Sequence, residues 1–135
     1  MKIRFVAGFS PITADPAASR DFYGKAVGVN LDSGDTEYPY THTLGGVKHF
    51  GLWPLAEAAL ACFGTPDWPA DLAVPQATIE FEVENVAAAE QELVAAGHAL
   101  VHGTRIEPWG QTTARLLSPE GLLVGIVSTP WLDDA

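Results

Sequence analysis

The residue pattern of this chain predicts the same order of secondary structure twice. A strand-like alternation over residues 3–12 is followed by Asp15 and Pro16, which form a helix N-cap and a first helical proline. A second alternation, over residues 77–83, is followed by another N-cap residue, Asn85. Each predicted helix ends at a glycine, and three strand-like segments follow it. The chain is therefore expected to contain two similar units.

Two units of this order predict an α+β fold with two βαβββ modules, whose strands form a curved, cup-shaped sheet with helices outside. The modules are expected over about residues 1–54 and 76–128 of a single domain, joined by a connector over 55–75 that holds a short helix. The module helices are expected at 16–26 and 86–96, and the further strands at 29–35, 38–44, 47–53, 98–106, 111–117 and 122–127.

The composition is that of a folded protein and argues against several kinds of partner. Apolar residues make up 47% of the 135 residues and charged residues 18%, and no apolar run reaches membrane-spanning length. The net charge of -10 argues against nucleic acid, which requires a basic face to neutralise phosphates. No signal-peptide pattern follows Met1, and Cys62 is the single cysteine. We therefore expect a cytoplasmic protein without an internal disulfide.

Three motifs occur in order along the chain: Asp21-Phe22-Tyr23 with Gly28 after it, the segment Glu80–Val86, and Ser118-Pro119-Glu120-Gly121. Their order and spacing resemble the vicinal oxygen chelate superfamily, which includes glyoxalase I, extradiol dioxygenases, and fosfomycin- and bleomycin-resistance proteins. The resemblance covers nearly the whole chain. It implies the same two-module cup that the repeated pattern predicts.

The resemblance also implies a divalent metal, held by His and Glu side chains of the first, fourth, fifth and eighth strands. The matching positions and their neighbouring registers hold Ala7 (or Phe5 and Phe9), Gly51 (or Trp53), Thr78 and Gly125. None of these side chains replaces a histidine or a carboxylate as a ligand of a divalent ion. A site built from Glu80, His49 and His42 is the remaining alternative. We therefore predict no metal and no other cofactor.

The segment Glu107-Pro108-Trp109-Gly110 is similar to a motif of the bleomycin-resistance proteins, in which the tryptophan stacks on the planar rings of the drug. The resemblance gives Trp109 the same role, and the departure from the family pattern after Gly110 leaves the ligand's identity open. Strand alternation adds further residues that face the cup. The predicted ligand-binding residues are Phe9, Tyr40, His42, His49, Trp53, Trp68, Trp109, Gly110 and Arg115.

Three side chains have more than one expected role or a role outside the cup. Trp68 either covers the cup as a lid or anchors the connector against the sheet. Arg115 either holds a carbonyl or phenolate of the ligand or forms a salt bridge with Glu80 or Glu82. Trp131 is expected to pack against a partner subunit.

The sequence thus predicts a non-catalytic protein that binds and sequesters a bulky planar aromatic natural product, such as an antibiotic, and so confers resistance. A symmetric homodimer is expected, because single-domain members of the superfamily pair so that the neighbour completes each cup. Two enzymatic alternatives remain. One is a metal-dependent glyoxalase- or dioxygenase-type enzyme with atypical ligands. The other is a cofactor-free biosynthetic enzyme that uses Glu80, Glu82 or His42 as its general base.

Overall fold

The computed structural model describes residues 1–31 and 38–132, and the structure is mixed α+β, as expected. Its strands are β1 (Phe5–Thr13), β2 (Tyr40–Thr41), β3 (Phe50–Gly51), β4 (Trp53–Pro54), β5 (Ala77–Glu82), β6 (His102–Ile106), β7 (Thr112–Leu117) and β8 (Leu123–Ser128). Its helices are α1 (Pro16–Arg20), the π-helix η1 (Asp21–Val27), α2 (Leu55–Phe63), α3 (Val86–Ala95) and the 3-10 helix η2 (Pro130–Leu132). Within the described residues, no helix combines the length and the apolar character needed to cross a membrane.

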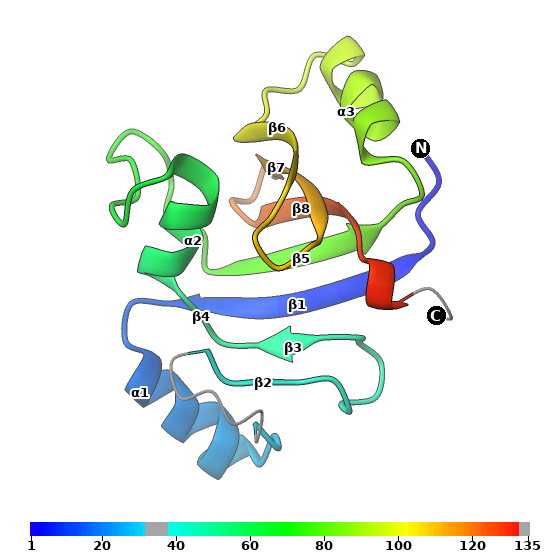
Figure 1. Ribbon diagram of the computed structural model, residues 1–135. Coiled ribbons are helices and arrows are strands. Elements are labelled where there is room, and N and C mark those ends of the chain that lie inside the picture. The colour runs from blue at the N-terminus through cyan, green and yellow to red at the C-terminus, as the bar shows by residue number, and fades with distance from the viewer. Residues whose placement is uncertain (32–37, 133–135) are drawn as a thin grey trace.

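All eight strands belong to one sheet, ordered β2-β3-β1-β5-β8-β7-β6, and β4 pairs with β1 beside this path. The first strands of the two halves, β1 and β5, run antiparallel at its centre. In each half the first strand is parallel to a later strand of the same half, β1 to β3 and β4, and β5 to β8. The repeated order of elements is therefore a structural repeat, and both halves contribute to one curved sheet (Figure 1).

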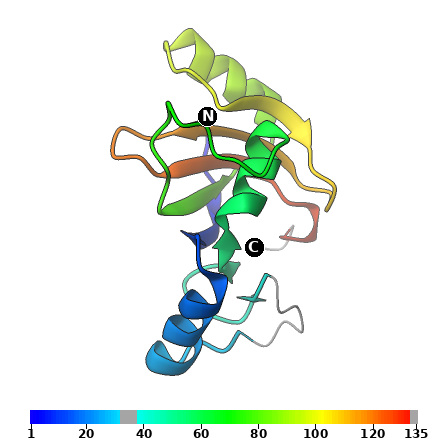
Figure 2. The same ribbon diagram turned by 90° about the vertical axis from the view of Figure 1, so that its left-hand side faces the viewer.

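The helices begin where the sequence predicts and lie around the sheet. Asp15 accepts a hydrogen bond from the Ala18 amide at 3.1 Å, and Asn85 accepts one from the Ala88 amide at 3.0 Å. Gly28 ends the first helical segment with a φ of 89°, which residues with a Cβ rarely adopt. α1 lies near β2 and β3, whereas α3 packs on β6, β7 and β8 at the opposite end of the molecule (Figure 2).

The strands of the first half are shorter than predicted. Only β2, β3 and β4 pair within the expected strands 38–44 and 47–53. Among the described strands β2 lies at the edge of the sheet, so it has a pairing partner on one side only. The expected strand over 29–35 falls mostly outside the described residues, and residues 29–31 have no regular structure.

A β-bulge on β1 changes which side chains of this strand face the inside of the curved sheet. The register with β5 shifts between Val6 and Gly8, where the strict alternation of sides is broken. Phe9 consequently lies on the helix side, packed with Phe50 at a ring-centroid distance of 6.4 Å. Phe9 therefore does not face the cup, contrary to the prediction from alternation.

Each half buries a hydrophobic core on the helix side of the sheet. The core beside α3 consists of Val83, Val86, Ala89, Ala114, Leu116 and Ile126. The core of the first half consists of Leu31, Phe50 and Leu52, with Phe9, Tyr23, Val29 and Val47 packed against it. Burial of apolar surface in these cores stabilises the folded state by about 25 cal/mol for each Å² removed from water. Because the cores occupy one face of the sheet, its other face, where residues of α2 also lie, can hold a site.

Candidate functional site

A cavity of about 1120 Å³ lies on the face of the sheet opposite the two cores. Its volume is slightly above the range of about 300–1,000 Å³ that is usual for small-molecule sites. Side chains from both halves of one chain line it, among them Ala7, Ser10, Tyr38, Tyr40, His42, His49 and Trp53 from the first half, and Thr78, Glu80, Trp109, Gln111, Arg115, Thr129 and Trp131 from the second.

One wall of the cavity is a cluster of four rings, those of Tyr38, Tyr40, His42 and His49. The ring centroids of Tyr40 and His49 are 5.4 Å apart with an interplanar angle of 27°, and those of Tyr40 and His42 are 4.9 Å apart. The Tyr38 and His49 centroids are 5.8 Å apart. Together the rings give the wall a polarisable aromatic surface on which a planar molecule can stack.

Hydrogen bonds run through the same ring cluster. His49 Nδ1 lies 2.9 Å from His42 Nε2, and His49 Nε2 lies 2.8 Å from the Tyr38 hydroxyl. Burial, together with the nearby His42, lowers the pKa of His49 to about 4, so the ring is neutral at neutral pH. Burial raises the pKa of Tyr38, so its hydroxyl stays protonated. The wall therefore carries no charge from these two groups.

Glu80 on β5 lies at the centre of the sheet, where the cavity has its floor. Both neighbouring strands carry a glycine opposite Glu80, Gly8 on β1 and Gly125 on β8. A Cβ atom at Gly125 would lie 3.1 Å from Glu80 Cγ, and one at Gly8 would lie 3.4 Å from Glu80 Oε1. The two glycines thus leave the room that the carboxyl group occupies. Burial raises the pKa of Glu80, although Arg115 and a hydrogen bond from Gln111 act in the opposite direction.

The side chains of the floor do not fit the divalent metal that the superfamily resemblance implies. Ala7 and Gly125 provide no donor atom, and the Thr78 hydroxyl donates to the Leu123 carbonyl at 2.8 Å. His49 uses both ring nitrogens in hydrogen bonds within the ring cluster. Among the residues that the structure describes, no three His, Cys, Asp or Glu side chains are grouped so that they could hold a metal ion.

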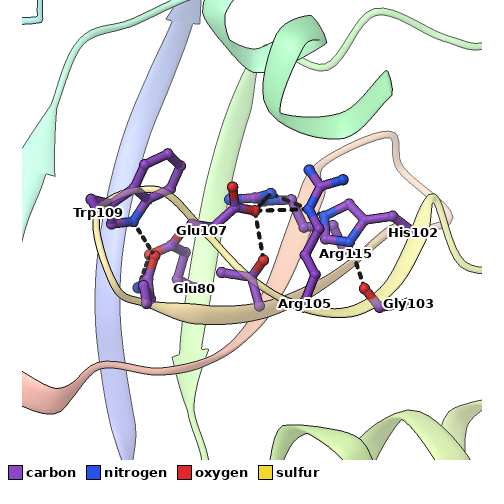
Figure 3. A network of polar contacts seen from close by, with 9 residues as sticks. Glu80, His102, Gly103, Arg105, Glu107, Trp109 and Arg115 are labelled. Atoms are coloured by element: carbon purple, nitrogen blue, oxygen red, sulfur yellow. Dashed lines mark hydrogen bonds and ion pairs between the residues drawn. The ribbon is translucent and has the colours of Figure 1, made fainter. Parts of the chain in front are cut away.

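Gln111 connects the floor of the cavity to Trp109. Its side-chain nitrogen donates to Glu80 Oε1 at 3.2 Å and to Thr129 Oγ1 at 2.9 Å. Its side-chain oxygen accepts a hydrogen bond from Trp109 Nε1 at 3.0 Å. Trp109 and Glu80 consequently lie close together at one end of the polar network in Figure 3. Trp109 is 48% exposed, so the network orients a ring that solvent and ligands can reach.

Glu107, at the start of the turn that carries the tryptophan, is held by side chains of both adjoining strands (Figure 3). Its Oε1 accepts hydrogen bonds from Thr113 at 2.8 Å, Arg115 Nη1 at 2.9 Å and Arg105 Nε at 3.1 Å. Burial alone would raise the pKa of Glu107, but Arg115 and the other donors together hold it below its ordinary value. The Gly110 amide donates to the Glu107 carbonyl at 2.9 Å and closes the turn.

The predicted ligand-binding residues that line the cavity are Tyr40, His42, His49, Trp53, Trp109 and Arg115. Phe9 does not line it, because the bulge on β1 turns its side chain into the core. Gly110 does not line it either, and its φ of 96° serves the turn. Trp68 packs edge-on against Phe63 at 5.0 Å and donates to the Ala73 carbonyl at 3.1 Å. Trp68 does not line the cavity, and both of these contacts lie within the connector and not against the sheet.

The structure shows an ion pair and several lining residues of the site that were not predicted. Arg115 pairs with Glu107, and not with Glu80 or Glu82. Tyr38, Gln111, Thr129 and Trp131 also line the cavity. Tyr38 alternates with Tyr40 and His42 along the predicted strand, so the same pattern could have placed Tyr38 on the cavity side. For Thr129 the sequence offers no such signal, because it follows the last strand.

No known family model matches this sequence, and no curated protein matches it either. Solved structures resemble its fold. A glyoxalase/bleomycin resistance protein/dioxygenase superfamily member from Vibrio splendidus is 18% identical, covers 95% of this chain and 100% of its own, and has a TM-score of 0.56. A methylmalonyl-CoA epimerase from Streptomyces coelicolor is 16% identical, with 95% and 96% covered and a TM-score of 0.56.

A third similar structure is an NAD-dependent benzaldehyde dehydrogenase from Legionella pneumophila, 13% identical, with 90% of this chain and 96% of that chain covered and a TM-score of 0.59. Identities this low are informative about fold and not about chemistry. On the strength of its sheet order and these similarities, the chain has the fold of the glyoxalase/bleomycin resistance/dioxygenase superfamily.

Proposed function

We propose that this chain binds a planar aromatic small molecule in its cup and holds it without changing it chemically. The observation that carries the proposal is the cavity of about 1120 Å³, walled by the rings of Tyr38, Tyr40 and His49. Trp109 adds an exposed ring to the same cavity. Contact between aromatic rings contributes about 0.5–1.5 kcal/mol beyond the burial of apolar area, so several such contacts suit a flat ligand.

Sequestration without turnover is supported by the floor of the cup. Ala7 and Gly125 lie where the resemblance places metal ligands, and neither offers a side-chain donor atom. The resemblance of Glu107–Gly110 to the bleomycin-resistance motif supports a natural product such as an antibiotic as the ligand. The protein then confers resistance by lowering the concentration of free drug. We extend the proposal to a symmetric homodimer with two equivalent sites.

A thermal-shift screen against planar antibiotics of quinone, enediyne and glycopeptide types tests this proposal. A ligand at about one hundred times its dissociation constant is expected to raise the free energy of unfolding by about 2.7 kcal/mol. The bound compound is then recovered and its mass and NMR spectrum are compared with those of the starting material. Unchanged spectra support sequestration, a chemically altered compound contradicts it, and the absence of any stabilising ligand contradicts binding.

The environment of Glu80 favours a second candidate function, proton transfer by a protein side chain. Glu80 lines the cavity, its pKa is raised by burial, and its hydrogen bond from Gln111 involves Oε1. Such a carboxylate can take a proton from an acidic C–H group of a ligand and return it. One protein with a similar fold is an epimerase. The superfamily fold therefore accommodates proton transfer as well as binding.

Deuterium exchange separates the two candidates. A stabilising ligand is incubated with the protein in D₂O, and its C–H signals are followed by NMR. Exchange that the wild type catalyses and Glu80→Gln does not would support proton transfer. The binding proposal predicts the same slow exchange with the wild type, with Glu80→Gln and without protein.

A further inference from the structure

Arg115 on β7 is a fully buried cation whose hydrogen-bonding capacity is only partly used. Its side chain is 0% exposed, and its Nη1 donates to Glu107 Oε1 at 2.9 Å and lies 3.0 Å from His102 Nε2. Its Nε and Nη2 are buried as well, and neither has a hydrogen-bond partner among the described residues. These two nitrogens share one edge of the planar guanidinium group, and such an edge can hold both oxygens of a carboxylate.

An unsatisfied pair of this kind requires a physical explanation. A buried donor without a partner costs about 1–3 kcal/mol, and more where the group is charged, so most buried polar groups in proteins are paired. Arg115 borders the cavity, where an acceptor atom brought by a ligand can supply the missing bonds. Glu107 and His102 bind Nη1, and none of the described groups bonds to Nε or Nη2.

Trp53 lies against the guanidinium group of Arg115. The Arg115 Cζ atom lies 5.4 Å from the centroid of the Trp53 ring, a cation–π contact. Because Arg115 is fully buried, an acceptor reaches it only after a neighbouring group has moved. Trp53 is partly exposed and lines the same cavity, so its side chain has room to turn.

The cavity carries charges of both signs, and its cations include two arginine side chains with unused donor atoms. Arg105 and Arg115 share the single carboxylate of Glu107, and the charge of Arg115 also acts on Glu80. Arg20 also lines the cavity, and its buried Nη1 has no partner within the described part of the chain. Among the described residues, three basic ones line the cavity, Arg20, Lys48 and Arg115, and so do three acidic ones, Asp15, Glu57 and Glu80. The preference for an anion is therefore local, at the unused donor atoms of Arg115.

We propose that the Nε–Nη2 edge of Arg115 binds a carboxylate on the planar ligand, and that Trp53 turns aside to admit it. This inference rests on the proposed binding function of the cup, and it adds the chemical class of the ligand, an aromatic acid. The carboxylate replaces the cation–π contact of Arg115 with two charge-assisted hydrogen bonds. The displaced Trp53 ring remains available to stack on the ligand's aromatic part.

Two probes of one shape test the inference, 2-naphthoate and 2-naphthamide. Isothermal titration measures both dissociation constants for the wild type, Arg115→Lys and Arg105→Lys. The wild type is expected to bind the carboxylate at least about tenfold more tightly than the amide. Arg115→Lys keeps the charge but loses the planar edge, so most of this preference is expected to disappear. Arg105→Lys alters another partner of Glu107 that does not line the cavity, and the preference is expected to remain.

Equal affinity of the wild type for the two probes, or failure to bind the carboxylate, overturns this inference, whereas the binding proposal is decided by the thermal-shift screen. Loss of the preference in Arg105→Lys also overturns it, because the effect then runs through Glu107. If Arg115→Lys does not fold, Trp53→Ala provides a second test of the carboxylate preference. It uncovers the guanidinium group, so we expect the preference to persist while the affinity for both probes falls. Disappearance of the preference in Trp53→Ala contradicts the inference.

Discussion

The indole nitrogen of Trp109 donates a hydrogen bond to the side-chain oxygen of Gln111, at 3.0 Å. This bond fixes the orientation of the Gln111 amide, whose nitrogen then donates to Glu80 and to Thr129. An exposed ring at the edge of the cavity is thereby connected to the carboxyl group on its floor. The position of Trp109 is set by a buried amide as well as by the turn that carries it.

Gln111→Leu is expected to lower the free energy of unfolding by about 1–3 kcal/mol, because Glu80 and Thr129 lose a donor while they remain buried or partly buried. Urea denaturation measures this change, and acrylamide quenching measures the freed Trp109 ring. The control is Gln91→Leu on the exposed side of α3, where a change within about 0.5 kcal/mol is expected. Equal stabilities of the two variants would contradict the role of Gln111.

Gly125→Ala is expected to destabilise the protein by about 1–3 kcal/mol, because its new methyl group would lie 3.1 Å from Glu80 Cγ and 3.4 Å from Val127 Cγ1. Adding Glu80→Ala removes the first of these contacts, so the double variant should recover part of the loss.

The matched control for this glycine is Gly45→Ala. Within the described part of the chain, no atom lies within 4 Å of the position that a Cβ at Gly45 would take, and Gly45 has no positive φ. Denaturation curves of the variants provide the comparison. If alanine is tolerated equally at both glycines, the steric account of the floor is wrong.

The half-buried ring of His49 predicts a loss of stability in mildly acidic solution. Its pKa is about 4 in the folded protein and 6.5 ordinarily. Between these values the unfolded chain binds a proton that the folded chain does not, so the contribution of His49 to the free energy of unfolding falls as the pH falls from about 6.5 to about 4. At about 1.36 kcal/mol per pKa unit, the full loss is about 3 kcal/mol.

Comparison with His49→Phe isolates this contribution from that of the carboxyl groups. Urea unfolding at several pH values is expected to show a shallower acid-side loss for His49→Phe than for the wild type. His98→Phe alters an exposed histidine and should retain the wild-type slope. Parallel pH profiles of the wild type and His49→Phe would rule out the depressed pKa.

The fold was accessible from sequence because its determinants are local. The caps Asp15 and Asn85, the terminating Gly28 and the period-two alternation of β5, β7 and β8 each depend on a few neighbouring residues. The short strands of the first half were not accessible in the same way. Pairing there depends on neighbours distant in sequence, and alternation alone overstates the length of β2 and β3.

The site was predicted less completely, for two physical reasons. A bulge inserts one residue into β1 and reverses the facing of Phe9, and Gly8 beside it is a general signal of a bulge that does not give the register. Polar partners across the sheet are the second reason. The pairing of Arg115 with Glu107, and of Gln111 with Glu80, depends on which long side chains meet in three dimensions. The aromatic residues Tyr40, His49, Trp53 and Trp109 follow simple strand and turn patterns and were found.

Affinity measurements on two tryptophan variants test most directly whether the cup binds a planar ligand against Trp109. A compound that stabilises the wild type is titrated calorimetrically into Trp109→Ala and into Trp68→Ala, the latter removing a ring that packs on Phe63 outside the cavity. We predict a dissociation constant at least about tenfold higher for Trp109→Ala, equivalent to about 1.4 kcal/mol, and one within about twofold of the wild type for Trp68→Ala. An unchanged affinity in Trp109→Ala, or the same loss in both variants, would contradict the account.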